Sequence, residues 1–529
     1  MKRGARTLAR SVASETSVSL GTRPPSSSGA AKEVRRTTYP KPFDQIPGPK
    51  PSLPFIGTSW QYSRWGRYNL YQLHDASTDK YHRYGDLMKE EYQWRRPVVH
   101  AFNPEDFEVI FRSQGRCPVR PPNEFVCKYR SEHPQKYNSV GLSNALGAEW
   151  HTLRMALAPV LLQMKTIAEL ATWQEEICND FASYVRWARD PDTLEIGCIQ
   201  DALSRLTLES IFMLCLDTRL GCLKPSEQEP SQASTVIAAA RQLFLAYQKL
   251  YYGLPLWKYV STPSYRQYTE AEDIIYKITL GYIRQYAKQK TQDSSSSTEN
   301  KSLLQALLSL DGLSEMDVHL TIMDFIAGGI FTTSIALCFL LHHLACNPNV
   351  QEKLYTELQS NKDISSCSYL RACIKESFRL SPTVPGLMRI LPEDVVLSGY
   401  KVPAGVPVFA NSLVTCRLEK YFPQPQSFLP ERWLGEARGR IHPFSLLPFG
   451  HGSRMCVGRR FSELELMTAA AKMVQNFVIE PCTQHINTTF VFVVVPSHPV
   501  GLRFRDYGPL SRGEPIPGRP ALHKEKRTL

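Results

Sequence analysis

The sequence predicts a mainly α-helical fold with small β-sheets. Apolar residues recur every three or four positions in 171–189 and 203–216, which is the pattern of amphipathic helices. Residues 318–345 form the longest apolar segment, long enough for a helix that crosses the whole body. Runs rich in β-branched residues lie between 395 and 413, at 488–495 and at 500–504. With 529 residues the chain buries enough surface on folding to hold a deep pocket.

Residues 1–40 are expected to lie outside the folded body. They contain eight Lys or Arg and two Glu, which gives half of the formal charge of +12, and they are rich in Ser and Thr. They have no apolar run of the length that a secretory signal needs, so they are typical of a mitochondrial transit segment, with a disordered basic tail as the alternative. We expect no N-terminal membrane anchor, and the small remaining charge gives little support for a nucleic-acid partner.

Prolines, glycines and short apolar runs divide the rest of the chain into elements. The prolines of 46–51 fix φ and predict a stiff lead-in, and the pattern from there to about residue 290 is mostly helical. The segment 318–345 contains Asp324, His342 and His343, which favours a buried central helix over a membrane span. Turn residues break 395–413 into hairpins, a proline-rich meander covers 422–432, and strands follow at 488–495 and 500–504. We therefore expect a domain over 41–510 and a basic tail over 511–529.

The cysteines indicate a reducing compartment. There are thirteen, an odd number, and no two are spaced Cys-x-x-Cys, so neither a disulfide framework nor a zinc ribbon is predicted. Most of them should be small buried hydrophobes, and only one in a special setting should carry chemistry.

One cysteine has that special setting, in the loop 449–458 (FGHGSRMCVG). Cys456 precedes a predicted helix that starts at Arg459, and the positive end of the helix dipole favours its thiolate, with Arg454 adding positive charge. Phe449 stands seven residues earlier and can shield the sulfur. Gly450, Gly452 and Gly458 let the backbone bend tightly and approach a flat ligand. A shielded thiolate in a glycine-rich loop is what an axial ligand of haem iron requires; the alternative is a buried cysteine after a glycine turn.

This loop resembles the haem-binding signature of the cytochrome P450 family, with Cys456 as the iron ligand and with Phe449, Gly450, Gly452, Gly458 and Arg454 at the family's fixed positions. The resemblance extends from residue 46 to about 504. The stretches 102–111, 216–221 and 397–403 are most similar to arthropod and other invertebrate mitochondrial members, which include ecdysteroid hydroxylases and xenobiotic-metabolising enzymes. It implies a single large helical domain that binds haem b through an axial thiolate.

The resemblance assigns roles to two further groups of residues. Glu376 and Arg379 are three apart, so they share a helix face, and the family ties such a pair to a second arginine, here Arg432, in a buried network under the haem. Cationic and indole donors are implied for the haem propionates. These are Trp150, Arg154, Arg389 and Arg454.

The segment 327–334 resembles the family's oxygen-binding segment. Its paired glycines predict a gap in the helix surface, and Thr332, with help from Thr333, is placed to relay a proton. The acid that normally precedes this threonine is replaced by Phe331, which cannot pass a proton. A peroxide-driven or isomerase-type enzyme of the same fold is therefore one alternative to a monooxygenase, and a non-catalytic haem-binding sensor is another.

Basic residues near the haem edge predict the electron donor. Arg371 and Lys375 match the spacing that mitochondrial members use for an adrenodoxin-type ferredoxin, itself reduced by its reductase, and Arg459 and Arg460 follow the cysteine. The aromatic segment 244–259 suggests peripheral contact with the matrix side of the mitochondrial inner membrane, with core packing of a helix pair as the alternative. By analogy, 119–138, 326–331 and 383–387 line the pocket. The expected activity is insertion of one oxygen atom from O2 into a lipophilic steroid or xenobiotic.

Overall fold

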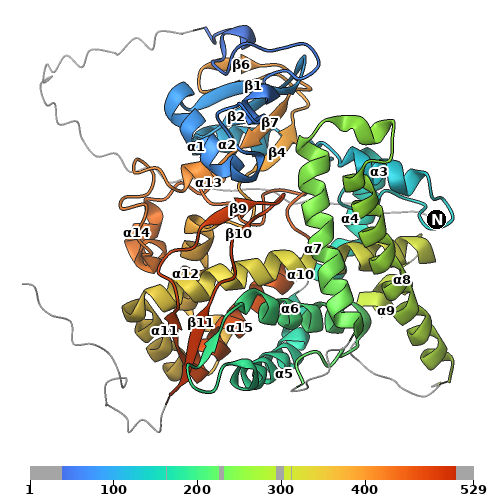
Figure 1. Ribbon diagram of the computed structural model, residues 1–529, viewed down its shortest axis with the longest axis vertical. Helices are drawn as coiled ribbons and strands as arrows, with labels where there is room; N and C mark the ends of the chain where they lie inside the picture. Colours follow the sequence, from blue (N-terminus) through green and yellow to red (C-terminus); the bar gives the residue numbers. More distant parts are fainter. Residues whose placement is uncertain (1–38, 163, 225–230, 293–302, 311, 508–529) are drawn as a thin grey trace, which may run out of the picture. The chain divides into compact units, whose positions relative to one another are not determined.

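The computed structural model describes residues 39–162, 164–224, 231–292, 303–310 and 312–507 (Figure 1). The predicted leader, apart from its last two residues, and the predicted tail at 511–529 lie outside the described residues. The compact unit that the described residues form starts at Pro40.

Helices make up most of the described chain, as the sequence predicts. The α-helices are α1 (Leu73–Tyr84), α2 (Pro104–Arg112), α3 (Glu124–Ser131), α4 (Gly147–Leu162), α5 (Met164–Ala188), α6 (Ile199–Leu216), α7 (Ser231–Tyr252), α8 (Pro263–Gln292), α9 (Leu303–Leu308), α10 (Glu315–Cys346), α11 (Pro348–Ser360), α12 (Ser368–Leu380), α13 (Ser412–Thr415), α14 (Gly435–Gly439) and α15 (Arg459–Asn476). Short 3-10 turns include η4 (Pro255–Lys258) and η6 (Pro430–Trp433).

The long apolar helix α10 runs through the middle of the folded body (Figure 1). Its start is fixed by a capping box: the Asp317 amide donates to Ser314 Oγ over 3.2 Å, and the Ser314 amide donates to Asp317 Oδ2 over 3.0 Å. The helix is long and apolar enough to cross a membrane, but 67% of its most apolar window is buried inside the protein. The prediction of a buried central helix is confirmed.

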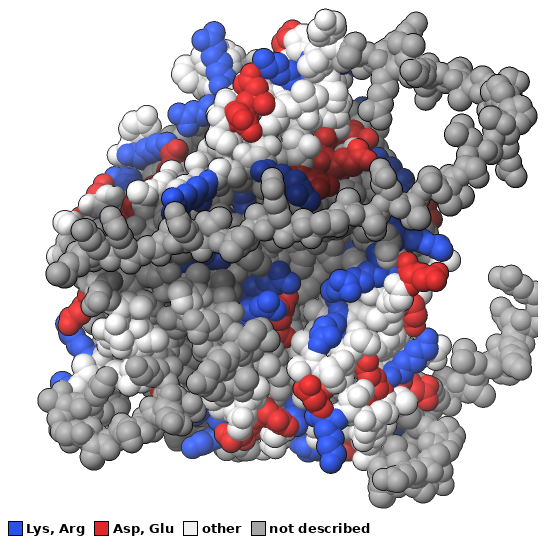
Figure 2. All heavy atoms as spheres, turned by 180° about the vertical axis from the view of Figure 1, so that it is seen from behind, with Lys and Arg blue, Asp and Glu red and all other residues white. Residues whose placement is uncertain are grey.

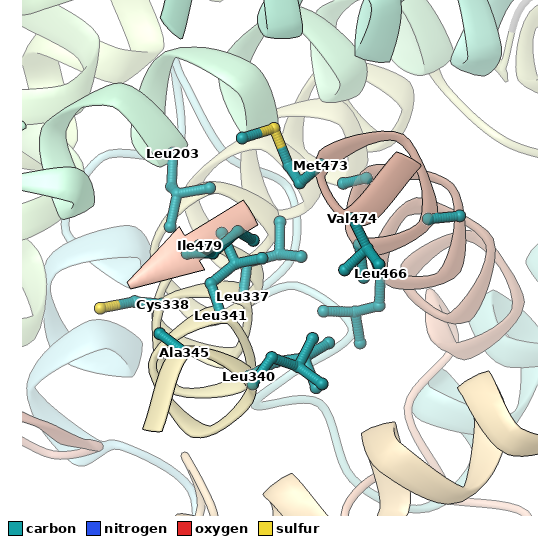
Figure 3. Packing of buried hydrophobic residues seen from close by; sticks show 14 of the residues in the cluster. Leu203, Leu337, Cys338, Leu340, Leu341, Ala345, Leu466, Met473, Val474 and Ile479 are labelled. Atoms are coloured by element: carbon teal, nitrogen blue, oxygen red, sulfur yellow. The ribbon is translucent and has the colours of Figure 1, made fainter. Parts of the chain in front are cut away.

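The second half of α10 packs in the largest hydrophobic core. Figure 3 shows Leu337, Leu340 and Leu341 of α10 against side chains of α6, α15 and strand β8 (Phe477–Pro481). The contacting residues labelled there are Leu203, Leu466, Met473, Val474 and Ile479. This packing holds α15, and with it the loop before α15, against the central helix.

Small sheets complete the fold. The largest has the order β1 (Leu87–Gln93), β2 (Arg96–Ala101), β7 (Pro407–Ala410), β4 (Leu387–Ile390), with β2 and β7 parallel and the other two pairs antiparallel. The remaining pairings are β5 (Val395–Leu397) with β6 (Tyr400–Val402), β9 (Thr488–Phe490) with β10 (Val494–Pro496), and β11 (Leu502–Asp506) between β3 (Glu195–Ile196) and β8.

The prediction that the chain is mostly helical up to about residue 290 is confirmed, but it did not include the β1–β2 hairpin. Strand β1 carries consecutive charged residues, Lys89, Glu90 and Glu91, and therefore lacks clear polar–apolar alternation. The hairpin turn holds Arg95 at φ 59°, where a glycine or asparagine would have signalled it. The predicted hairpin near 395–413 is present as β5 and β6, but residues after Asn411 form α13 instead of a strand.

Candidate functional site

The predicted cysteine loop forms a tight turn that ends at α15. Gly450 and Gly452 adopt φ values of 79° and 74°, a region that other residues rarely enter. The Cys456 amide donates to the Phe449 carbonyl over 2.8 Å, which closes the loop and sets the two side chains at its ends. Phe449 packs edge-on against Phe378 of α12, with ring centroids 5.5 Å apart. The loop is therefore held by the two helices on either side of it.

The thiol of Cys456 is accessible, although protein atoms surround it closely. All thirteen cysteines lie among the described residues as free thiols. Eleven of them are buried or half-buried, and only Cys456 and Cys482 are exposed. Burial nevertheless raises the pKa of Cys456, while a hydrogen bond from the Gly458 backbone and the charges of Arg154, Arg120 and Arg459 oppose that rise. Cys456 is therefore an exposed residue whose thiol is desolvated by the protein atoms around it.

Arg454, which the sequence places near this thiol, contacts Trp150 of α4 and Ala145 just before that helix. Its guanidinium lies over the Trp150 ring, 4.4 Å from the ring centroid, and donates to the Ala145 carbonyl. The cations that oppose the rise in the pKa of Cys456 are Arg154, Arg120 and Arg459.

Four guanidinium groups gather beside the cysteine loop: those of Arg120, Arg154, Arg389 and Arg454. Burial and the other three arginines lower the pKa of Arg454 to about 9, and burial followed by Arg120 lowers that of Arg389 to about 10. Burial also lowers the pKa of Arg120 and of Arg154, partly offset by Cys456. Sequence reasoning missed Arg120, which precedes two prolines in a loop without a motif and donates to the Ser143 carbonyl over 3.0 Å.

These cations fit a ligand with carboxylate groups. None of the four arginines has a carboxylate within ion-pair distance among the described residues, and Arg454 Nε, Arg454 Nη1 and Arg389 Nε are buried without a hydrogen-bond partner there. Leaving such donors unpaired is costly, so the site needs anions. Haem propionates are anions that these groups would satisfy, and the same region supplies Cys456 as a ligand for iron. The residues present therefore fit haem.

On α10, only one of the two neighbouring glycines leaves a gap. A methyl group added at Gly328 would meet no atom within 4 Å, whereas one at Gly329 would lie 3.0 Å from Ile211 of α6. Thr332 Oγ1 donates to the Gly328 carbonyl over 2.7 Å, one turn away on the same face. The exposed Gly328 and half-buried Thr332 thus share a face that remains open in an otherwise buried helix.

The neighbours of Thr332 point elsewhere. Thr333 is 4% exposed, and its hydroxyl lies 3.0 Å from that of Ser462 on α15, in a hydrogen bond that joins the two helices. Phe331 packs against Phe244 of α7, with ring centroids 4.9 Å apart. Of the three, Thr332 alone combines a hydroxyl with the open face.

The predicted network of Glu376, Arg379 and Arg432 is assembled and buried. Arg379 Nε and Nη2 donate to the two Glu376 oxygens over 3.0 and 2.8 Å, and Arg432 Nε donates to Glu376 Oε1 over 3.0 Å. The Trp433 indole also donates to Glu376, over 2.8 Å. Both Glu376 and Arg379 are 0% exposed. The charges are therefore fully hydrogen-bonded, which a buried network requires.

The predicted basic residues cluster at the N-terminal end of α15 and along α12. Burial lowers the pKa of Lys375, and the nearby charges of Arg438, Arg371 and Arg459 lower it further. Arg459 is partly neutralised by Glu463, at 2.8 Å. On the back of the molecule as a whole, acidic and basic side chains lie side by side (Figure 2). Arg438 of α14 was not identified from the sequence, because it becomes a neighbour only when α14 folds beside α12.

The sequence and this geometry agree with comparisons to known proteins. A model of the cytochrome P450 family matches residues 47–504. Ecdysone 20-monooxygenase of Drosophila melanogaster is 33% identical over 478 residues, which cover 87% of this chain and 88% of the relative. Cytochrome P450 302a1, mitochondrial, of the same fly is 32% identical over 457 residues, covering 84% and 91%. Probable cytochrome P450 CYP44 of Caenorhabditis elegans is 31% identical over 467 residues, covering 85% and 92%.

Proposed function

Because the chain belongs to the cytochrome P450 family and is a haem-thiolate monooxygenase, we propose that it oxidises a lipophilic steroid or xenobiotic in mitochondria, with electrons from an adrenodoxin-type ferredoxin. The similar insect proteins support the compartment, since several carry the word mitochondrial in their names. The relative named ecdysone 20-monooxygenase supports a steroid such as an ecdysteroid, and the chain resembles it over most of its length.

The haem assignment rests on one observation: Cys456 lies beside four arginines that have no carboxylate partner in the described part of the chain. Haem bound here would supply the chemistry of oxygen activation. The chain's own part would be to ligate the iron through Cys456, to hold the propionates with Arg154, Arg389 and Arg454, and to exclude bulk water. Thr332 would hold a proton at Oγ1, next to the Gly328 carbonyl and on the open face of α10.

The electron donor is proposed from the basic cluster of Arg371, Lys375, Arg438, Arg459 and Arg460. Clustered cations accelerate association with an acidic partner, and salt screens the attraction. We expect the rate of haem reduction by an adrenodoxin-type ferredoxin to fall steeply with ionic strength, and Arg371→Gln with Lys375→Gln to flatten that dependence. A rate that is independent of salt, or a salt dependence unchanged in this variant, would show that another donor or another face is used. Lys401→Gln, at an exposed ion pair elsewhere, is the matched control.

Membrane contact is proposed for the segment 254–260. Most aromatic residues of 244–259 face inward, and Trp257 is 5% exposed, because they pack between α7, α8 and α3. Leu254, Leu256, Tyr259 and Val260 are instead 55–87% exposed, and Lys258 lies among them. An exposed apolar group beside a cation suits a membrane interface. The double variant Leu254→Ser with Leu256→Ser should reduce flotation with anionic liposomes. Trp187→Ser, at another exposed apolar site, should not reduce it. Equal flotation of the unaltered protein and both variants would show that residues 254–260 do not contact the membrane.

One observation favours a peroxide-driven enzyme as the second candidate. Phe331 packs against Phe244 and offers no proton at the position before Thr332. Product formed from hydrogen peroxide without ferredoxin, at a rate comparable to the ferredoxin-supported rate, would favour this candidate.

A further inference from the structure

The sulfur of Cys456 lies beside the first turn of α15. Gly458 is the N-cap residue of this helix, and a β-carbon built on it would lie 4.0 Å from Cys456 Sγ. Further along the same helix, Leu466 and Val474 are buried in the largest hydrophobic core (Figure 3). This packing fixes the helix, so a charge carried by its first turn is held near the sulfur.

Arg459 carries such a charge. It is the first residue of α15, and its guanidinium carbon lies 5.9 Å from the centroid of the Phe449 ring. The Phe449 carbonyl accepts the hydrogen bond from the Cys456 amide that closes the cysteine loop. The guanidinium group therefore lies where the two ends of the loop meet. Its charge favours the thiolate, because it opposes the rise in the pKa of Cys456 that burial causes.

Bound haem would change which cations act on the sulfur. Arg120 and Arg154 also oppose the rise in the pKa of Cys456, but they belong to the four arginines whose charges the haem propionates would neutralise. Arg459 instead has a partner within the chain, since its Nε lies 2.8 Å from Glu463 Oε1, one turn further along α15. The net charge near the sulfur in the haem-loaded protein therefore depends on the balance between Arg459 and Glu463.

The neighbouring cation Arg460 provides a comparison. Its Nη1 lies 3.9 Å from Glu463 Oε2, at the limit of an ion pair, and its side chain is 48% exposed. The cations that oppose the rise in the pKa of Cys456 include Arg459 but not Arg460. The side chains of Arg459 and Glu463 are 39% and 30% exposed, so water weakens their charges without cancelling them.

We propose that Arg459 is a positioning residue that acts through the Cys456 sulfur and raises the reduction potential of the haem, and that Glu463 limits this effect. Reduction of the iron adds one negative charge to a centre that already carries the thiolate. A fixed cation beside the sulfur stabilises the reduced form more than the oxidised form. The inference rests on Cys456 as the iron ligand and is independent of the substrate and of the docking of a ferredoxin.

Redox titration of the haem-loaded protein, with dithionite and small mediator dyes and without substrate or ferredoxin, tests the proposal. At a fixed potential, Arg459→Gln should lower the ratio of ferrous to ferric protein about threefold, which corresponds to a fall of about 30 mV for a one-electron couple. Glu463→Gln should raise this ratio, because it leaves the Arg459 charge without its partner. Arg459→Lys keeps the charge, so its ratio should lie closer to that of the unaltered protein than to that of Arg459→Gln.

Arg460→Gln is the matched control, because it removes the neighbouring cation, and its potential should change less than that of Arg459→Gln. The proposal would be overturned by an unchanged potential in Arg459→Gln, by a potential in Glu463→Gln that is not raised, or by an equal fall in Arg460→Gln. A fall in Arg459→Lys as large as that in Arg459→Gln would also overturn it, since the charge would not be the cause. The absorption spectrum of each reduced variant under carbon monoxide reports thiolate ligation separately, so a failure of the haem-thiolate assignment would be distinguishable.

Discussion

Thr332 and Thr333 are adjacent in sequence but have different partners. The Thr332 hydroxyl bonds to its own helix at the open Gly328, whereas the Thr333 hydroxyl bonds to Ser462 of another helix. Sequence reasoning alone could not separate them, because the direction of each side chain depends on how α10 packs against α15. Their roles in proton delivery are therefore predictions that two matched variants can distinguish.

We predict that Thr332→Ala uncouples electron consumption from product formation. Removing a proton donor at the reacting site typically costs about 10²-fold in rate. NADPH oxidation, hydrogen peroxide and product should be measured together, and product per NADPH should fall. Thr333→Ala should instead lower stability by about 1 kcal/mol, the value of one hydrogen bond, and leave coupling intact. Equal uncoupling by both variants would contradict the assignment to Thr332.

A second prediction for a single residue concerns the buried network of Glu376, Arg379 and Arg432. Arg379→Leu would leave the Glu376 carboxylate buried and short of two donors, which should cost about 3–5 kcal/mol and prevent stable haem incorporation. Haem content and the urea midpoint measure both effects. Lys401→Ala removes an exposed ion pair with Asp394 and should cost less than about 1 kcal/mol. Normal haem content in Arg379→Leu would refute a role for this network in holding the site.

Among the elements, α15 joins the cysteine loop to the core and carries an unusual carboxyl group. Glu465 is 2% exposed, faces Ser210 of α6, and its Oε1 has no hydrogen-bond partner among the described residues. Burial raises the pKa of Glu465 to about 8. The folded protein therefore keeps this proton between about pH 4.5 and about pH 8, while the unfolded chain has lost it, so stability falls as the pH rises through this window.

We predict that Glu465→Gln removes this pH dependence. Relative to Glu465→Gln, the free energy of unfolding of the unaltered protein should fall by about 4 kcal/mol between about pH 4.5 and about pH 8. Above about pH 8 the difference in this free energy between the two proteins should level off. Urea unfolding of both proteins across this range measures it. Glu463→Gln is the control, because that carboxylate is partly exposed and paired with Arg459. Parallel stability curves for the unaltered protein and Glu465→Gln would contradict a buried neutral carboxyl group.

The elements also show how far the sequence could predict the fold. The helix α10 was predicted correctly from its long apolar run, and the β5–β6 hairpin from its turn residues, because both signals are local in the sequence. The β1–β2 hairpin was missed because strand β1 lacks clear polar–apolar alternation and Arg95 stands at the turn. The pairing of β2 with β7, by contrast, joins segments that are distant in sequence. Pairing between distant segments leaves no local pattern in a single sequence.

For the molecule as a whole, the site depends on side chains brought together from distant parts of the chain. Cys456 could be identified from its loop, and Trp150, Arg154 and Arg389 from the family resemblance. Arg120 and Arg438 could not, because only the folded chain places them beside the thiol and the basic cluster. The location of buried cations without a carboxylate partner is likewise a property of the folded molecule.

The absorption spectrum of the reduced protein under carbon monoxide tests the central claim most directly. If Cys456 ligates haem iron as a thiolate, the difference spectrum should show the red-shifted Soret band of thiolate ligation, and Cys456→His should lose it while Cys482→Ser, the other exposed cysteine, should keep it. A haem-loaded protein that lacks this band, or a band that persists in Cys456→His, would contradict the account.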